Sequence, residues 1–170
     1  MKIHIHDFLR SISFNPDLTC LICAFAPFQE RKGGYGVFST NSFSRLAWRE
    51  FETGGFGIAE MYDHTNVVLL VGGRKSPSGF SERSVAFYDD ATSEVLWDIK
   101  LPYPVLSVQC KRDIVLITLE SSIFIYRIGP SFSSLVYETS FSTLSNAPGL
   151  CALSASNSAM QVRMPGVCAV

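Results

Sequence analysis

The sequence has little of what catalytic and nucleic-acid-binding proteins commonly use. It contains three histidines, and 14 Lys and Arg residues nearly balance 15 Asp and Glu residues, which gives a net charge of −1 over 170 residues. Bulk charge therefore gives no reason to expect binding to nucleic acid. A Gly-x-Ser-x-Gly motif is missing, and no local pattern pairs a serine with a histidine. We expect a protein that is not an enzyme, uses no cofactor and binds no nucleic acid.

Long hydrophobic runs are also missing. The longest nearly uncharged apolar stretch, residues 18–28, is interrupted by Thr19 and Pro27 and is too short to cross a bilayer as a helix. Near the N-terminus, two histidines and an aspartate stand where a signal peptide would have its apolar segment. We therefore expect an intracellular protein of the cytoplasm.

Cysteines are few and irregularly spaced. The chain has five cysteines, an odd number, and their spacing is irregular, which argues against a secreted disulfide scaffold. Cys20 and Cys23 match C-x-x-C, but residues three apart on a strand point to opposite faces, and no second pair lies at zinc-finger spacing. We expect reduced, mostly buried thiols at Cys20, Cys23, Cys110, Cys151 and Cys168.

Short β-prone segments separated by polar turns are abundant. Residues 105–128 are the clearest case, because three runs rich in Val, Ile and other β-formers are joined by polar tripeptides at 111–113 and 120–122. The last run alternates with the period of two that is typical of a strand. Turn chemistry about every seven residues excludes a helix here. Both faces of this small sheet are apolar, so both must be covered.

Such strands recur in groups of four that start about 45 residues apart, which is typical of blades in a WD-type propeller. We predict an all-β fold, namely a partial β-propeller with an N-terminal tail at residues 1–10. The structural alternative is a β-sandwich. The blades are expected at residues 11–51, 57–99 and 105–140, with an incomplete fourth at 148–170. The expected strands are residues 11–14, 19–25, 35–40 and 46–51, then 58–62, 67–71, 84–89 and 94–99, then 105–110, 114–119, 123–128 and 135–139, and finally 150–154 and 160–164.

Three and a fraction blades cannot close a ring, because closed propellers need at least about four. An open arc leaves a sheet face and a strand edge uncovered, and such edges pair with other chains. We expect a partial product of a longer protein or a chain that needs a partner, with self-association through the open sheet edges as one possibility.

Three short motifs have possible chemical interpretations. His4 and His6 have the spacing of a metal pair in amidohydrolase barrels, but the chain is too short for that barrel, so a polar tail is favoured and a metalloenzyme is kept as an alternative. Residues 72–76 resemble the end of a Walker loop, but Val68 replaces its first glycine and no helix follows, which favours a basic flexible loop. The adjacent carboxylates at residues 89–90 point to opposite faces of a strand, and we expect one to cap the following turn.

Several segments, in order and nearly in spacing, resemble the PROPPINs, the WD-repeat phosphoinositide-interacting propellers of autophagy. The resemblance extends from residue 11 to about residue 153, and together the segments are specific for the family. They include residues 13–17 (SFNPD), 54–61 (GGFGIAEM), 69–73 (LLVGG), 85–90 (VAFYDD), 105–128, 137–139 (YET) and 149–153 (GLCAL).

The resemblance implies a seven-bladed propeller, of which this chain holds about three and a half blades. It also implies binding of the full-length form to phosphatidylinositol 3-phosphate or 3,5-bisphosphate on autophagic or endosomal membranes, and recruitment of autophagy proteins, notably a large lipid-transfer protein. The family's lipid motif contains an Arg-Arg pair in the fifth blade, and this sequence has no Arg-Arg dipeptide. We therefore expect no lipid-binding residue in this chain. The alternative is a protein-interaction propeller fragment without lipid binding.

Partner contacts are the property that these blades can retain. By resemblance, the partner surface includes the first-blade turn with Asn15 and Asp17 and the second-blade loop with Arg74 and Lys75. An ordinary turn also uses Asn-Pro-Asp, because Asn and Asp hydrogen-bond to their own backbone and Pro fixes φ. The last ten residues differ from the family's continuation, which fits a truncated gene model, a splice product or a fragment.

Overall fold

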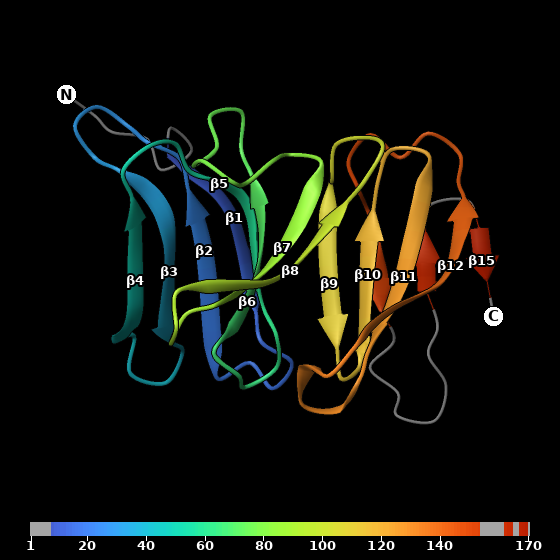
Figure 1. The fold of residues 1–170 in the computed structure, drawn as a ribbon, viewed down its shortest axis with the longest axis horizontal. Helices are drawn as coiled ribbons and strands as arrows, with labels where there is room; N and C mark the ends of the chain where they lie inside the picture. Colours follow the sequence, from blue (N-terminus) through green and yellow to red (C-terminus); the bar gives the residue numbers. More distant parts are fainter. Residues whose placement is uncertain (1–7, 154–161, 165–166, 170) are drawn as a thin grey trace. The chain divides into compact units, whose positions relative to one another are not determined.

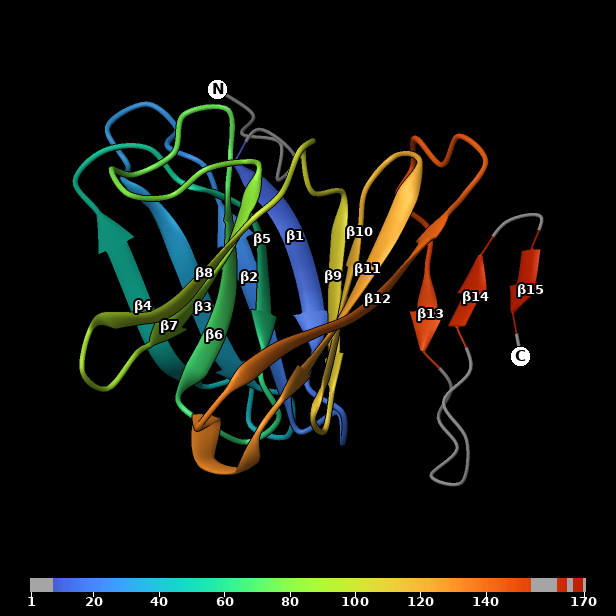
Figure 2. The same ribbon diagram turned by 45° about the vertical axis from the view of Figure 1, so that its right-hand side comes forward.

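The computed structural model describes residues 8–153, 162–164 and 167–169, and in this part it confirms the all-β expectation (Figures 1 and 2). The described strands form three antiparallel sheets of four strands and one sheet of three. The chain divides into two compact units, residues 1–101 and 102–170. No helix among the described residues has the length and apolar character that crossing a membrane requires.

The first unit contains two four-stranded meanders in which every strand pairs with its neighbour in sequence. The β1 strand begins at Leu9, within the expected tail, and the other strands lie within two residues of their expected limits. The strands are β1 (Leu9–Phe14), β2 (Cys20–Phe25), β3 (Gly33–Ser39), β4 (Arg45–Phe51), β5 (Phe56–Met61), β6 (Val67–Gly72), β7 (Ser84–Asp89) and β8 (Glu94–Lys100).

The core of the first unit lies between its two sheets. Alternate residues of β2 and β3 face the second sheet, with Ile22, Ala24 and Tyr35 fully buried, and β5 packs against β1, β2 and β3. Aromatic rings fill the space between them, and burial of each contributes about 1.5–3 kcal/mol. The cluster comprises Tyr35, Phe51, Phe56, Phe80 and Tyr88.

The C-x-x-C cysteines diverge as the strand period predicts. Cys20 packs against this core, whereas the Cys23 thiol donates to the Gly36 carbonyl at 3.6 Å. Four cysteines in the described residues are free, and Cys110 is buried while the other three are half-buried, so burial is less complete than expected. The free thiols are Cys20, Cys23, Cys110 and Cys151.

The second unit contains a third four-stranded meander followed by a small three-stranded sheet. A buried cluster on β10 and β11 is covered by Cys151 and Leu153. The Gln109 amide joins these segments, since it donates to the Cys151 carbonyl at 2.6 Å and accepts from the Leu153 N–H at 3.0 Å. The elements are β9 (Ser107–Lys111), β10 (Ile114–Thr118), β11 (Ser122–Ile128), the turn η2 (Pro130–Phe132), β12 (Leu135–Ser142), β13 (Ala152–Leu153), β14 (Val162–Met164) and β15 (Val167–Ala169).

Differences from the expected strands concentrate in the last sheet. The strand expected at residues 150–154 begins only at Ala152, as β13, and residue 154 lies outside the described residues, whereas β15 was not expected at all. Short strands with few alternating positions carry little periodic signal, which explains why the third strand was missed. His4 and His6 lie outside the described residues, so the metal-pair interpretation stays a hypothesis.

Candidate functional site

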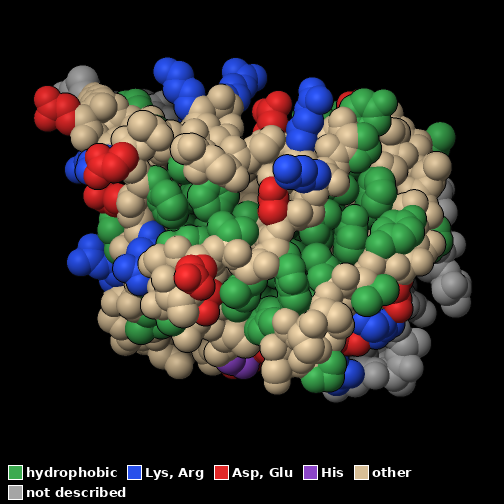
Figure 3. All heavy atoms as spheres, in the orientation of Figure 1, with side chains coloured by type: hydrophobic (Ala, Val, Ile, Leu, Met, Phe, Trp, Pro, Cys, Tyr) green, Lys and Arg blue, Asp and Glu red, His purple; other side chains and the backbone are tan. Residues whose placement is uncertain are grey.

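The predicted contact residues lie at opposite ends of the first unit. Asn15 and Asp17 belong to the β1–β2 turn, whereas Arg74 and Lys75 begin the β6–β7 loop (Figure 1). The β5–β6 turn shares the first end, because His64 Nε2 lies 3.3 Å from Asp17 Oδ2. Figure 3 shows Lys and Arg atoms along the other end. The structure therefore separates the four residues into two candidate contact regions.

The Asn15 side chain stabilises its own turn. It is only 1% exposed. Its Oδ1 accepts from the Cys20 N–H at 2.8 Å, and its Nδ2 donates to Thr19 Oγ1 at 3.1 Å. These bonds match the ordinary-turn interpretation of Asn-Pro-Asp, and they turn the side chain away from any partner.

Asp17 instead faces solvent. The Thr19 hydroxyl and N–H donate to its Oδ1 at 2.7 and 3.1 Å. The hydrogen bond from the Thr19 side chain is the main reason that the pKa of Asp17 lies below its ordinary value, so the group is a carboxylate at neutral pH. Next to it, Leu18 is 64% exposed and has a φ of 64°. The tip of the turn thus presents a negative charge beside an apolar side chain.

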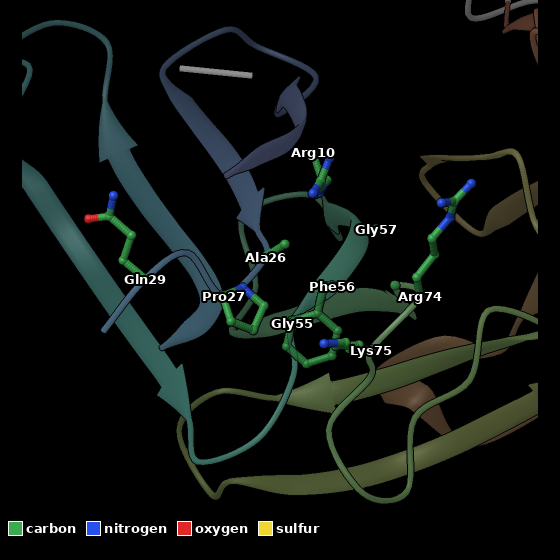
Figure 4. A pocket seen from close by; sticks show the side chains of 10 residues that line it. Arg10, Ala26, Pro27, Gln29, Gly55, Phe56, Gly57, Arg74 and Lys75 are labelled. Carbon is green, nitrogen blue, oxygen red and sulfur yellow. The ribbon is translucent and has the colours of Figure 1, made fainter. Parts of the chain in front are cut away.

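At the opposite end, a cavity of about 680 Å³ opens between the loops (Figure 4). Three of its ten lining residues are cations, and none of the ten is acidic. Buried Phe56 forms part of its floor. Figure 4 shows Lys75 lying against Gly55 and Phe56, with Arg74 extending outward on the side away from Gln29. The lining residues are Arg10, Ala26, Pro27, Gln29, Gly55, Phe56, Gly57, Gly73, Arg74 and Lys75.

Backbone contacts fix the loop that carries two of these cations. The Gly55 N–H donates to the Lys75 carbonyl at 2.7 Å, and the Gly73 N–H donates to the Gly55 carbonyl at 3.1 Å. Gly54 has a φ of 72°, and a Cβ there would lie 2.3 Å from the Lys75 carbonyl oxygen. Only glycine permits this close approach. The glycine turn in the sequence therefore seats the basic loop.

Sequence reasoning missed Arg10 as a cavity residue, because it was assigned to the N-terminal tail. The apolar and polar alternation of β1, with Leu9 half-buried and Arg10 exposed, was the available signal. It was overlooked because the strand was expected to begin at residue 11.

The two carboxylates of residues 89–90 have separate structural roles. Asp89 Oδ1 accepts from the Ala91 N–H at 2.9 Å, which confirms the expected cap. Asp90 binds the other sheet, accepting from the Tyr35 hydroxyl at 2.5 Å and from Arg49 Nε at 2.7 Å. Burial alone would raise the pKa of Asp90, but the hydrogen bonds from Arg49 and Tyr35 outweigh it and lower the pKa. Burial and this carboxylate raise the pKa of Tyr35.

Metal ligation finds no support among the residues that the structure describes, where no three His, Cys, Asp or Glu side chains gather as ligands. The cavity offers nitrogen cations and backbone, which suit an anionic ligand rather than a metal ion.

Comparison with known proteins gives related sequences over most of the chain, although no family model matches. The sequence is 27% identical to SVP1-like protein 2 of Schizosaccharomyces pombe over 145 residues, which cover 85% of this chain and 37% of that protein. It is 26% identical to Autophagy-related protein 18 of Komagataella pastoris over 151 residues, which cover 89% of this chain and 25% of that protein. The chain thus spans well under half the length of these curated relatives, and neither name describes an enzyme.

Solved structures confirm the propeller fold. Kluyveromyces lactis Hsv2 matches with a TM-score of 0.58 at 16% identity, covering 85% of this chain and 38% of that one. KlAtg21, solved in complex with the coiled-coil of AgAtg16, matches with a TM-score of 0.68 at 18% identity, covering 91% of this chain and 46% of that one. At these identities the likeness concerns the fold alone, and it makes the four-stranded sheets blades of a partial propeller rather than layers of a sandwich.

Proposed function

We propose that this chain, a member of the PROPPIN family across its three complete blades, provides protein-docking blades to a non-enzymatic scaffold of autophagy. The observation that carries the proposal is sequence similarity to autophagy proteins over 85% and 89% of the chain. The propeller fold supports it, because its blades hold loops on a rigid frame where they can contact partners.

Two exposed regions are proposed as contacts. Asp17 lies at the tip of the β1–β2 turn, and Arg74 and Lys75 lie at the cavity on the opposite end, so the two regions differ in charge. Asn15 supports the first region by holding its turn. The partner class is an autophagy protein, with a large lipid-transfer protein as the candidate that the family resemblance implies.

Membrane association is proposed only for the full-length form. That form would bind phosphatidylinositol 3-phosphate or 3,5-bisphosphate and lie peripherally on autophagic or endosomal membranes. This chain lacks the Arg-Arg pair that carries lipid recognition in the family it resembles. Co-sedimentation with vesicles that contain or lack phosphatidylinositol 3-phosphate tests both statements. The proposal is contradicted if the full-length form does not co-sediment with vesicles that contain the lipid, or if this chain binds them saturably.

Charge reversal tests the docking regions. Asp17→Arg and Arg74→Glu should each weaken capture of the partner from cell extract, whereas Glu94→Arg and Arg83→Glu reverse exposed charges outside both regions and should not. Capture that persists in both test variants would refute the assigned surfaces. Partner capture that needs neither lipid nor the full-length form favours the second candidate, a docking module without a membrane role.

A further inference from the structure

We propose that the outer face of the first sheet binds the same face of a second copy of this chain, with the strands of the two copies antiparallel. The outer face is the side of β1 to β4 that points away from the second sheet, and it carries Ile12, Phe14, Phe38, Arg45, Trp48 and Glu50. The proposal goes beyond the docking role above, and it concerns a sheet face rather than the open sheet edges.

The outer face is apolar and exposed. Side chains alternate along β1 and β2, so Ile22 and Ala24 are buried against the second sheet while Ile12 and Phe14 point the other way. Ile12 is 56% exposed and Phe14 is 50% exposed, and Trp48 on β4 is 38% exposed. Exposed apolar side chains that share one face of a soluble protein mark an interaction surface.

The Trp48 ring lies flat on the outer face. It stacks on Phe25 with the ring centroids 4.4 Å apart and 19° between the ring planes. A Cβ at Gly36 would lie 2.7 Å from Trp48 Cε3, so glycine at this position lets the ring rest against the sheet. A flat apolar sheet face is well covered by another sheet, because two sheets pack face to face about 10 Å apart.

Two opposite charges beside Trp48 favour a second copy as that other sheet. Arg45 Cζ lies 5.8 Å from the Trp48 ring centroid and Glu50 Oε1 accepts from Trp48 Nε1 at 3.0 Å, so both charges stand on this face at opposite ends of β4. Among the described residues neither has an ion-pair partner, and Lys32, the cation near Glu50, pairs with Glu52 at 2.7 Å. A two-fold axis that crosses the strands above Trp48 places Arg45 of each copy opposite Glu50 of the other.

The size of the outer face predicts a weak dimer. Four strands of six or seven residues cover about 20 Å by 19 Å, at 3.3 Å per residue and 4.8 Å per strand, so two copies cover roughly 800 Å² of planar area. Stable complexes bury about 1,200–2,000 Å², and smaller interfaces are typical of transient ones. Charge pairing therefore decides which of several weak arrangements forms.

Sedimentation equilibrium of the full 170-residue chain between about 1 and 200 μM tests the proposal, and we expect a monomer–dimer equilibrium in this range. Arg45→Glu and Glu50→Arg should each weaken dimerisation at least about tenfold, because both charge pairs of the dimer become repulsive. An equimolar mixture of the two variants should regain the original affinity to within about threefold, because the reversed charge of each variant then faces its opposite.

The matched controls are Arg83→Glu and Glu94→Arg, which reverse exposed charges that do not lie on the first sheet. They should leave dimerisation unchanged, and unchanged thermal melting of all four variants shows that folding is not the cause.

Four outcomes overturn the proposal. A monomer at every concentration means that the outer face does not bind a second copy, and assemblies larger than a dimer indicate pairing through the open sheet edges. Unchanged dimerisation of both test variants places the contact elsewhere on the chain. A mixture that associates no better than the separate variants means that Arg45 does not face Glu50, as in a parallel arrangement that sets β4 against β1 of the other copy.

Discussion

Glu60 is the carboxyl whose burial gives the sharpest test of this structure. It lies half-buried on β5, the strand that packs against β1, β2 and β3. Burial raises its pKa from 4.5 to about 7, and a hydrogen bond from Ser13 opposes that rise. Below about pH 7 the folded chain therefore holds this carboxyl mostly in its protonated form.

The sign and size of the effect follow from linkage. Between pH 4.5 and about 7 the folded chain holds a proton at Glu60 that the unfolded chain has released, so stability falls as pH rises through this window. Each pKa unit corresponds to about 1.4 kcal/mol, so the loss of stability above pH 7 is at most about 3.5 kcal/mol. A Gln at this position stays neutral and can still bond to Ser13.

Urea unfolding at pH 4.5 and pH 8 measures the prediction. Glu60→Gln should have nearly the free energy of unfolding of the original chain at pH 4.5 and exceed it by up to about 3.5 kcal/mol at pH 8. The exposed Glu94→Gln is the matched control and should change stability equally at both pH values. The reasoning is refuted if Glu60→Gln shifts stability by the same amount at both.

Two further predictions concern polar groups that hold the first unit together. Asp90→Asn should lower the free energy of unfolding by about 1.5–3 kcal/mol near pH 7 in urea titrations, because the hydrogen bonds from Arg49 and Tyr35 lose their charged acceptor. This loss should shrink as pH falls below the ordinary Asp pKa of 3.8. The control, exposed Asp98→Asn, should change the free energy of unfolding by no more than about 0.5 kcal/mol. Asn15→Ala should cost about 1–3 kcal/mol in the same titration, because the Cys20 N–H loses its acceptor, and a loss no larger than that of exposed Asp17→Ala would contradict the assigned role of the buried amide.

Most strands could be predicted from the sequence because their signals are local. Alternation and turn residues marked the strands of the three complete blades to within a few residues. The bonds that join sheets were invisible, because Tyr35 and Asp90 are 55 residues apart and neither carries a pattern that names its partner. The missed third strand of the last sheet, β15, is short and lies beyond any strong periodic signal.

Only part of the candidate site could be predicted from the sequence. Asn15 and Asp17 stand in one turn, and either could have faced outward. The structure decides between them, since the Asn15 amide fits inward against the Cys20 N–H while Asp17 bonds to Thr19 at the surface. Arg10 joins the cavity only because β1 extends two residues further than its apolar pattern suggested.

The separation of the two contact regions constrains any partner that uses both. They lie at opposite ends of strands of six residues, a length of about 20 Å at 3.3 Å per residue. A single small side-chain cluster cannot reach both ends, whereas an extended segment of about six residues or a helix of about 13 residues can. A partner that lies along the unit would place positive groups at Asp17 and negative groups at Lys75. A double-variant cycle compares the loss of capture when both regions are reversed with the product of the two single losses. A double loss equal to that product indicates one rigid segment that contacts both ends independently. A double loss larger than that product indicates that the partner changes its path.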